Sequence, residues 1–417
     1  MSKEVTLEDI VSLCKRRGFI FQGSEIYGGL AGTWDYGPLG VSLKKNLTDL
    51  WWKTFVEDRE DMVGVDAAIL MNPRTWKASG HVDTFTDPLV ECSECKGRFR
   101  ADKIDLRKCP TCGAENSFGE ARQFNLMFKS FAGPLTKDIQ SAKYKVNSVE
   151  MTNGDRIDSE KNDSAILYQD SSKIYLRPET AQGIFTNFKN VVDTLYPDVP
   201  FGIAQIGKAF RNEISPRDFV FRSREFNQME IEYFINEKDW QERFEKWRTD
   251  ILSFLKEAGV DVSKVKEAEV SPEDLAHYSK RTIDYEFEYP HGADELLGLA
   301  YRTDFDLQNI QRESGKNMEY RPKDGSEPFV PHVIEPSFGV ERLIMAVLCS
   351  AYTEDEVNGE KRIYLKFPAH IAPVKYCVSP LLKNKLELVE KAREVYSALK
   401  KKHGTVMWDD NGNIGKR

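Results

Sequence analysis

Residues 201–213, FGIAQIGKAFRNE, and residues 225–235, EFNQMEIEYFI, are the part of the sequence that decides the fold. In both segments apolar side chains alternate with small or polar ones, which is the pattern of half-buried β-strands. The short segment between them contains Pro216, a residue that favours a loop. The sequence therefore predicts two neighbouring antiparallel strands at the centre of the molecule.

Further strands and helices are predicted around this pair. Residues 296–308 and 331–337 read as additional strands, and residues 338–352 as a buried helix. Helices are also predicted for residues 7–17, after a capping box from Thr6 to Asp9, and for residues 43–55 and 240–254. The fold class is therefore α+β, an antiparallel sheet flanked by helices. The broad apolar stripe of residues 43–55 suits burial on two sides, as at the subunit interface of a homodimer.

The 417 residues exceed the roughly 100 to 200 of a typical single domain. After Lys366 the pattern changes to a strand at 374–379, a helix at about 381–402 and a strand at 405–408. We predict a domain at 1–368 and a second at 369–417. Two strands and one helix are too few for a stable independent core, so this second domain looks truncated. Residues 133–172 are polar and lack periodicity, which suggests a surface insertion.

The formal net charge of −8 argues against a basic field that draws the whole molecule to nucleic acid. Residues 369–417, however, contain ten Lys or Arg and five Asp or Glu. This basic tail is either a solvated helix face or a local contact to a polyanion. No apolar run is long enough to span a membrane, and the first residues lack the apolar core of a secretory signal. We therefore expect a cytoplasmic protein without a membrane partner.

Four of the seven cysteines lie close together, in the spacing C-x2-C-x13-C-x2-C. Two such pairs can present four thiolates to one tetrahedral Zn²⁺, and no position is left open for a substrate. We predict a structural zinc ribbon at residues 91–113; the alternative is a degenerate ribbon without metal. The proposed ligands are Cys92, Cys95, Cys109 and Cys112.

Side chains suited to binding or catalysis lie in and beside the two central segments. Strand alternation places four side chains on one face, those of Arg222, Phe226, Gln228 and Glu230. Such a face could hold a nucleotide and an amine. The guanidinium would bind phosphate oxygens, the aromatic ring would lie against the base, and the carboxylate would bind an ammonium group. The alternative is a ladder of ion pairs on a solvated sheet face.

This pattern, with IEPSFGVERL at 334–343, resembles motifs 2 and 3 of the class II aminoacyl-tRNA synthetases. LRPETAQGIF at 176–185, AQIGKAFRNEISPR at 204–217 and REFNQMEIEYF at 224–234 are similar to the dimeric glycyl-tRNA synthetases, and the similarity runs over nearly the whole chain. It implies that glycine and ATP form glycyl-adenylate, and that the glycyl group is then transferred to the 3′ end of tRNA(Gly).

The resemblance also implies a set of ATP-binding residues. Arg211 would orient the α-phosphate, Arg222 and Arg342 would hold the outer phosphates, and Phe226 with Arg342 would enclose adenine. Arg211 and Arg342 are thus the expected catalytic residues. Mg²⁺ would bridge phosphate oxygens and bind Glu295 and Glu335. The complete expected set is Arg211, Asn212, Glu213, Arg222, Phe226, Glu295, Leu296, Gly339, Glu341 and Arg342.

For glycine, the resemblance implies an anionic pocket. Glu179, Glu230 and Glu335 would surround the ammonium group, and Ser337 would lie beside the α-carbon. Arg302 or Arg100 would lie near the carboxylate, and Gln228 completes the expected set. A pocket this small excludes every larger amino acid, so no editing domain is needed. Three buried carboxylates without a cation would repel one another, and we expect raised pKa values for them.

Two further expectations concern tRNA. The zinc-ribbon segment carries Arg98, Arg100, Lys103 and Arg107 and would either support the acceptor end or only stabilise the fold. The basic C-terminal unit resembles the first part of the family's α/β anticodon-binding domain. A rival interpretation is a catalytically silent synthetase-like paralogue, for example a polymerase accessory or regulatory protein. Such a protein would be expected to have lost at least one of Arg211, Arg222, Phe226, Glu335 or Arg342, and all five are present.

Overall fold

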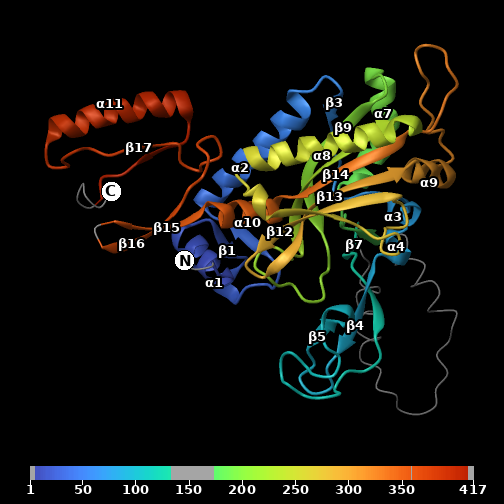
Figure 1. Ribbon diagram of the computed structural model, residues 1–417, viewed down its shortest axis with the longest axis horizontal. Coiled ribbons are helices and arrows are strands. Elements are labelled where there is room, and N and C mark those ends of the chain that lie inside the picture. The colour runs from blue at the N-terminus through green and yellow to red at the C-terminus, as the bar shows by residue number, and fades with distance from the viewer. Residues whose placement is uncertain (1–4, 133–172, 358, 412–417) are drawn as a thin grey trace.

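The computed structural model describes residues 5–132, 173–357 and 359–411. Its centre is a seven-stranded sheet in the order β11-β12-β13-β14-β10-β9-β3, antiparallel except for the β3–β9 pair (Figure 1). The predicted pair of central strands is confirmed, with Glu230 opposite Gln205. The strands are β3 (Met62–Gly64), β9 (Phe201–Phe210), β10 (Glu225–Ile235), β11 (Val265–Glu269), β12 (Arg281–Tyr289), β13 (Gly292–Thr303) and β14 (His332–Gly339).

The alternation along β10 assigns the two faces of the sheet. Met229, Ile231 and Tyr233 point into the main hydrophobic core, whereas Gln228, Glu230 and Glu232 point to the opposite face. Three helices cover the apolar face, and their apolar stripes account for its core: α2 (Pro38–Trp52), α8 (Trp240–Glu257) and α10 (Val340–Ala351). The polar face is thereby left for the residues that carry chemistry.

The apolar stripe of α2 is buried within this chain. Trp51 and Phe55 contact Phe338 of β14, and Phe55 also contacts Trp247 and Phe254 of α8. The stripe therefore has partners in the same chain, and the subunit interface inferred from its width stays a prediction. The homodimer remains a prediction that rests on the family resemblance.

A second, smaller core closes one end of the polar face. Helix α7 (Ala181–Leu195) places Phe185 and Phe188 against Phe234 of β10. Helix α9 (Phe305–Ser314) packs beside it. Residues 304–308 were expected to belong to the strand predicted at 296–308, but β13 ends at Thr303. Its positive φ of 59° turns the chain, and α9 begins two residues later.

Smaller elements complete the described chain. Helix α1 (Leu7–Arg17) has the predicted capping box between Thr6 and Asp9. Around it and along the rest of the chain lie β1 (Ile20–Gln22), η1 (Glu25–Tyr27), β2 (Trp34–Tyr36), η2 (Lys53–Glu57), α3 (Pro73–Ala78), α4 (His81–Thr84), β7 (Lys129–Phe131), β8 (Lys173–Tyr175), η4 (Glu237–Asp239), η5 (Val262–Lys264), β15 (Tyr352–Val357) and β16 (Glu360–Leu365). The predicted insertion at 133–172 lies outside the described residues.

Two peripheral units extend from this body. A three-stranded sheet of β4 (Thr86–Glu91), β5 (Arg98–Arg100) and β6 (Arg122–Asn125), with η3 (Ala101–Lys103), carries the cysteine segment. At the other end, β17 (Tyr376–Val378) and β18 (Val406–Trp408) pair in parallel beside α11 (Leu386–His403), as the βαβ pattern predicted. Figure 1 shows this unit to one side of the seven-stranded sheet. Among the described helices, none is both long and apolar enough to cross a lipid bilayer.

Candidate active site

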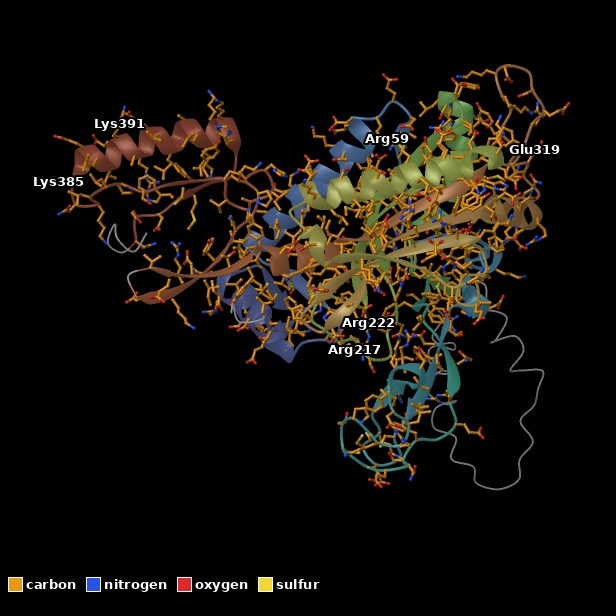
Figure 2. The ribbon with its side chains drawn as sticks, viewed as in Figure 1. Arg59, Arg217, Arg222, Glu319, Lys385 and Lys391 are labelled. Atoms are coloured by element: carbon orange, nitrogen blue, oxygen red, sulfur yellow. The ribbon has the colours of Figure 1, made fainter. Side chains whose placement is uncertain are left out.

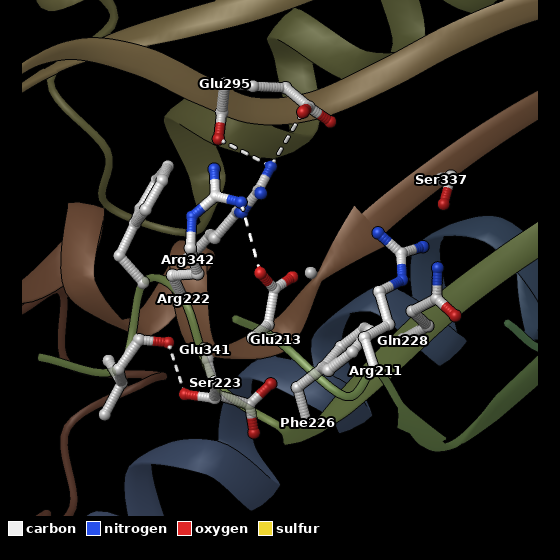
Figure 3. A pocket seen from close by; sticks show the side chains of 13 residues that line it. Arg211, Glu213, Arg222, Ser223, Phe226, Gln228, Glu295, Ser337, Glu341 and Arg342 are labelled. Carbon is white, nitrogen blue, oxygen red and sulfur yellow. Dashed lines mark hydrogen bonds and ion pairs between the residues drawn. The ribbon is translucent and has the colours of Figure 1, made fainter. Parts of the chain in front are cut away.

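A cavity opens on the polar face of the sheet, between the ends of β10, β13 and β14, the β9–β10 loop and the start of α10 (Figure 3). Most residues predicted to bind ATP line it, namely Arg211, Glu213, Arg222, Phe226, Glu295, Gly339, Glu341 and Arg342. Gln228 and Ser337, both predicted for glycine, line the same cavity. The sequence motifs that lie far apart along the chain are thus brought to one place.

Arg342 anchors one wall of the cavity. One guanidinium nitrogen, Nη1, donates to the backbone oxygen of Glu295 at 3.0 Å and pairs with its carboxylate at 2.9 Å. The guanidinium also lies over the ring of Phe221, 4.5 Å from its centroid. Attraction to Arg342 lowers the pKa of the Glu295 carboxyl. The side chain is held over the cavity by contacts on two sides, with its positive charge facing inward.

Two more arginines converge on the cavity. Arg211 donates to the backbone oxygen of Pro178 at 3.1 Å and lies 5.2 Å from the ring centroid of Phe226. Arg222 pairs with Glu213 at 3.4 Å. Arg222 belongs to the β9–β10 loop and not to β10, so its predicted place on the face of that strand was wrong. It nevertheless lines the expected cavity. Arg217 and Arg222 lie at the edge of the sheet that faces the β4–β5 unit (Figure 2).

Glu341 fixes the start of α10 against β10. Its carboxylate accepts hydrogen bonds from the backbone and side-chain nitrogens of Asn227, at 2.8 and 2.7 Å, and from the Tyr36 hydroxyl at 3.0 Å. Asn227 points to the helix side of the sheet because it has the opposite parity to Phe226 and Gln228. The cavity wall is therefore tied to both strand and helix.

At Ser337 the cavity meets a buried cluster of acidic residues, Glu179, Glu230 and Glu335, which we call the acidic pocket. The Ser337 hydroxyl donates to Glu230 at 2.8 Å. The other carboxylate oxygen of Glu230 accepts from the hydroxyl and the backbone N–H of Thr180, at 2.5 and 3.1 Å. Glu230 is almost fully buried, and these hydrogen bonds fix its orientation.

Two further carboxylates lie in the same pocket, each beside a basic side chain. Glu179 is 3.3 Å from Nε2 of His81. Glu335 pairs with Arg302 at 2.6 Å, and Arg302 also forms a two-point contact with Asp306 at 2.8 and 3.0 Å. The acidic residues predicted around the ammonium group are thus brought together, with Arg302 among them.

The charges of this pocket affect its carboxyl groups differently. Burial raises the pKa of Glu230, and repulsion from Glu179 adds to the rise. Burial also raises the pKa of Glu335, although Arg302 opposes it. Burial favours the neutral form of Glu179 too, but His81, Arg302 and Arg211 lower its pKa to about 2. The expectation of raised pKa values is therefore confirmed for Glu230 and Glu335 and wrong for Glu179, whose neighbour His81 was not foreseen.

Known proteins share this sequence and fold. The family model for the tRNA synthetase class II core domain (G, H, P, S and T) matches residues 166–351. Glycine--tRNA ligase of Clostridium acetobutylicum is 46% identical over 100% of this chain and 89% of that protein. Glycine--tRNA ligase of Borrelia garinii is 45% identical over 99% and 86%. This chain belongs to the glycine--tRNA ligase family. Giardia lamblia prolyl-tRNA synthetase in complex with prolyl-adenylate has a TM-score of 0.63 at 14% identity, over 100% of this chain and 67% of that one, and so shares its fold.

The class II fold expected from the family resemblance is therefore confirmed, but three predicted site residues lie elsewhere. Arg100 pairs with Asp87 and Asp102, at 2.9 and 2.8 Å, in a recess beside Arg222. Of the two arginines predicted for the glycine carboxylate, only Arg302 reaches the acidic pocket. Leu296 packs into the main core, and Asn212 does not line the cavity. Their backbone positions beside Glu295 and Arg211 explain why the motif pattern included them.

The shared Mg²⁺ site predicted for Glu295 and Glu335 is also wrong. Glu335 lies opposite Ala300 of β13, which is five residues along the strand from Glu295, or about 16 Å. Glu335 interacts with Arg302 in the acidic pocket, whereas Glu295 lines the main cavity. Only Glu295 is placed where it could meet phosphate-bound Mg²⁺.

Some residues of the site were missed by sequence reasoning. His81 lies about 100 residues before its partner Glu179, and a single histidine gives no signal of that contact. Phe221 was missed as the surface under Arg342 because it lies in the loop. Thr180 immediately follows Glu179 in the RPET segment, so its proximity could have been inferred from that motif.

The four predicted zinc ligands lie together in the β4–β5 unit. Their sulfur atoms are all within 4.8 Å of one another. Two of the distances, Cys92 to Cys112 and Cys95 to Cys109, are 3.7 Å. Four thiolates at the usual Zn–S distance of about 2.3 Å form a tetrahedron with edges of about 3.8 Å. The arrangement fits one Zn²⁺ ion.

Proposed function

We propose that this chain activates glycine with ATP to glycyl-adenylate and transfers the glycyl group to the 3′ end of tRNA(Gly). The observation that carries this proposal is the continuity of the site. A cavity lined by Arg211, Arg222 and Arg342 is also lined by Ser337, whose hydroxyl donates at 2.8 Å to Glu230 of the acidic pocket. A polyanion and an ammonium group can thus be held side by side.

The main cavity is suited to ATP. Arg211 is nearest to the acidic pocket, since it also bonds Pro178 next to Glu179, and would orient the α-phosphate where the carboxylate attacks. Arg222 and Arg342 would hold the outer phosphates, and the Phe226 ring and Arg342 would enclose adenine. Mg²⁺ bound at Glu295 would supply neutralisation of phosphate charge.

The acidic pocket is suited to glycine. Glu230 and Glu179 would receive the ammonium group, and Arg302, which is held by its pair with Glu335, would lie near the carboxylate. Ser337 would lie against the α-carbon, where any side chain would have to displace it. Selection by size suffices for glycine because no proteinogenic amino acid is smaller.

Zn²⁺, tRNA and a second subunit complete the proposal. Zn²⁺ bound by the four cysteines would stabilise the β4–β5 unit, and the basic C-terminal unit, with Lys385 and Lys391 at its surface, would contact tRNA (Figure 2). A homodimer is supported by Ile26, Tyr27 and Val41, which are more than half exposed near the start of the chain. We also propose that the protein is located in the cytoplasm, as expected from the sequence.

Exchange of labelled pyrophosphate into ATP tests the first step. We expect exchange that depends on glycine and is not supported by alanine or serine, because a methyl group would meet Ser337. Exchange with alanine or serine but not glycine would refute the specificity. No exchange with folded, pure protein would favour the catalytically silent paralogue, although the presence of all three cavity arginines argues against it.

A further inference from the structure

Glu232 is a buried carboxyl group that the proposed reaction does not use. It follows Glu230 on the same face of β10 and is 0% exposed. Among the described residues, no N–H or O–H group donates to either of its carboxyl oxygens, and its hydrogen-bonding neighbour is the carboxyl group of Glu335. An ionised carboxylate in such a place would lose its hydration without any compensation, which costs far more than burying a neutral one.

The strand register places a second carboxyl group next to it. Glu230 is opposite Ser337 and Tyr233 is opposite Ile334, so Glu232 lies opposite Glu335 of β14. Side chains directly opposite each other on neighbouring strands are about 5 Å apart at Cβ, and like charges there are destabilising. Two buried negative charges cannot both be kept at this distance without a cation between them.

The nearby cation is already engaged. Arg302 of β13 pairs with Glu335 and makes a two-point contact with Asp306 of α9. The remaining charged neighbour is Glu230, and helix α7 contributes only the neutral Gln182, which bonds Asp306. Burial and repulsion from Glu335 both raise the pKa of Glu232 well above its ordinary value.

We propose that Glu232 keeps its proton at neutral pH and is a positioning residue for the glycine pocket. Its neutral carboxyl group removes the repulsion from Glu335, so Glu335 keeps its ion pair with Arg302. The ion pair between Glu335 and Arg302 then has no further buried charge behind it. The protonation state follows from the fold alone; its role in holding glycine rests on the proposed function.

The pH dependence of folding tests the proton directly. A carboxyl group that is protonated in the native state and ionised in the unfolded state makes the native state less stable as pH rises. Glu232→Gln removes this dependence. The quantity to compare is the folding equilibrium constant of Glu232→Gln divided by that of the wild type. Between pH 5.5 and 7.5 we expect this ratio to rise by up to about tenfold per pH unit. The matched control, Glu288→Gln at an exposed position of β12, should show a constant ratio.

A ratio for Glu232→Gln that does not change over this pH range would overturn the proposal. If Glu232→Gln does not fold, infrared spectroscopy of the wild type decides, because a protonated glutamate has a carbonyl band that shifts when glutamate carries ¹³C at its carboxyl carbon. Absence of that band at pH 7 would also overturn the proposal. Neither the folding measurement nor the infrared measurement requires catalysis. A failure of the proposed function would appear in the pyrophosphate exchange and would leave both results unchanged.

Kinetics test the positioning role. Glu232→Leu is neutral but cannot hydrogen-bond Glu335, so we expect it to raise the KM for glycine about tenfold while the KM for ATP stays the same. Glu232→Gln keeps a neutral hydrogen-bonding group and should keep the KM for glycine within about threefold of the wild type. An unchanged glycine KM in Glu232→Leu, or a tenfold rise in Glu232→Gln, would contradict the positioning role.

Discussion

Single side chains of β10 have distinct environments although they are neighbours in sequence. Glu230 accepts three hydrogen bonds from Thr180 and Ser337, whereas Glu232, two residues along the same face, accepts none among the described residues. The first is oriented to act as an anion, and the second is placed to stay neutral. Parity alone puts both on one face and does not distinguish them.

Substitution of Glu230 by Gln tests the assignment of the ammonium site. The amide keeps the shape and one accepting oxygen, but it replaces the other oxygen with a donating NH2 group and removes the negative charge. We expect the KM for glycine to rise about 30-fold, which corresponds to about 2 kcal/mol for a hydrogen bond to a charged group. The KM for ATP should stay within about twofold. An equal loss of affinity for both substrates would refute the assignment.

The positions of side chains along β10 could be predicted from the alternation of a β-strand. Phe226, Gln228 and Glu230 lie on the predicted face, and the register with β14 adds Ser337. Sequence reasoning did not work for contacts that depend on folding of distant segments. His81 meets Glu179, and Arg100 lies in the recess beside Arg222 instead of the glycine pocket. No local pattern records either distance.

Whole elements were predicted best where the hydrophobic period was long and regular. Helices α1, α8 and α10 and strands β9 and β10 were expected near their observed positions. Helix α9 was mistaken for a strand, because residues 304–308 are too few to show a helical period and the turn at Thr303 has no sequence signal. The apolar stripe of α2 was recognised, but its partner was not, since a stripe does not say which surface will cover it.

The cysteine-bearing unit of β4, β5 and β6 gives a prediction about metal content. Elemental analysis should find about one zinc per chain in the wild type, because four thiolates at tetrahedral distances bind the ion tightly. Cys95→Ser should lose most of it. Cys377→Ser changes an exposed cysteine in β17, outside this unit, and should retain the metal. Equal zinc content in both variants, or none in the wild type, would refute a four-cysteine site.

In the whole molecule, the two faces of the seven-stranded sheet have different roles. The apolar face binds α2, α8 and α10 and forms the main core, and the polar face holds the cavity and the acidic pocket. The motifs indicated the glycine--tRNA ligase family because characteristic charged residues follow one another in β10, in the loop before it and at the junction of β14 and α10. The homodimer is not decided by these features, since the surface that would pair is not marked by a sequence motif.

The central claim is that one continuous site holds glycine and ATP together. A non-hydrolysable analogue of glycyl-adenylate tests it most directly, because such a molecule occupies both parts at once. Calorimetry should show one analogue bound per chain, at least 100-fold more tightly than glycine, and both glycine and ATP should compete with it. Competition by ATP but not by glycine would show that the acidic pocket does not hold the amino acid and would contradict the account.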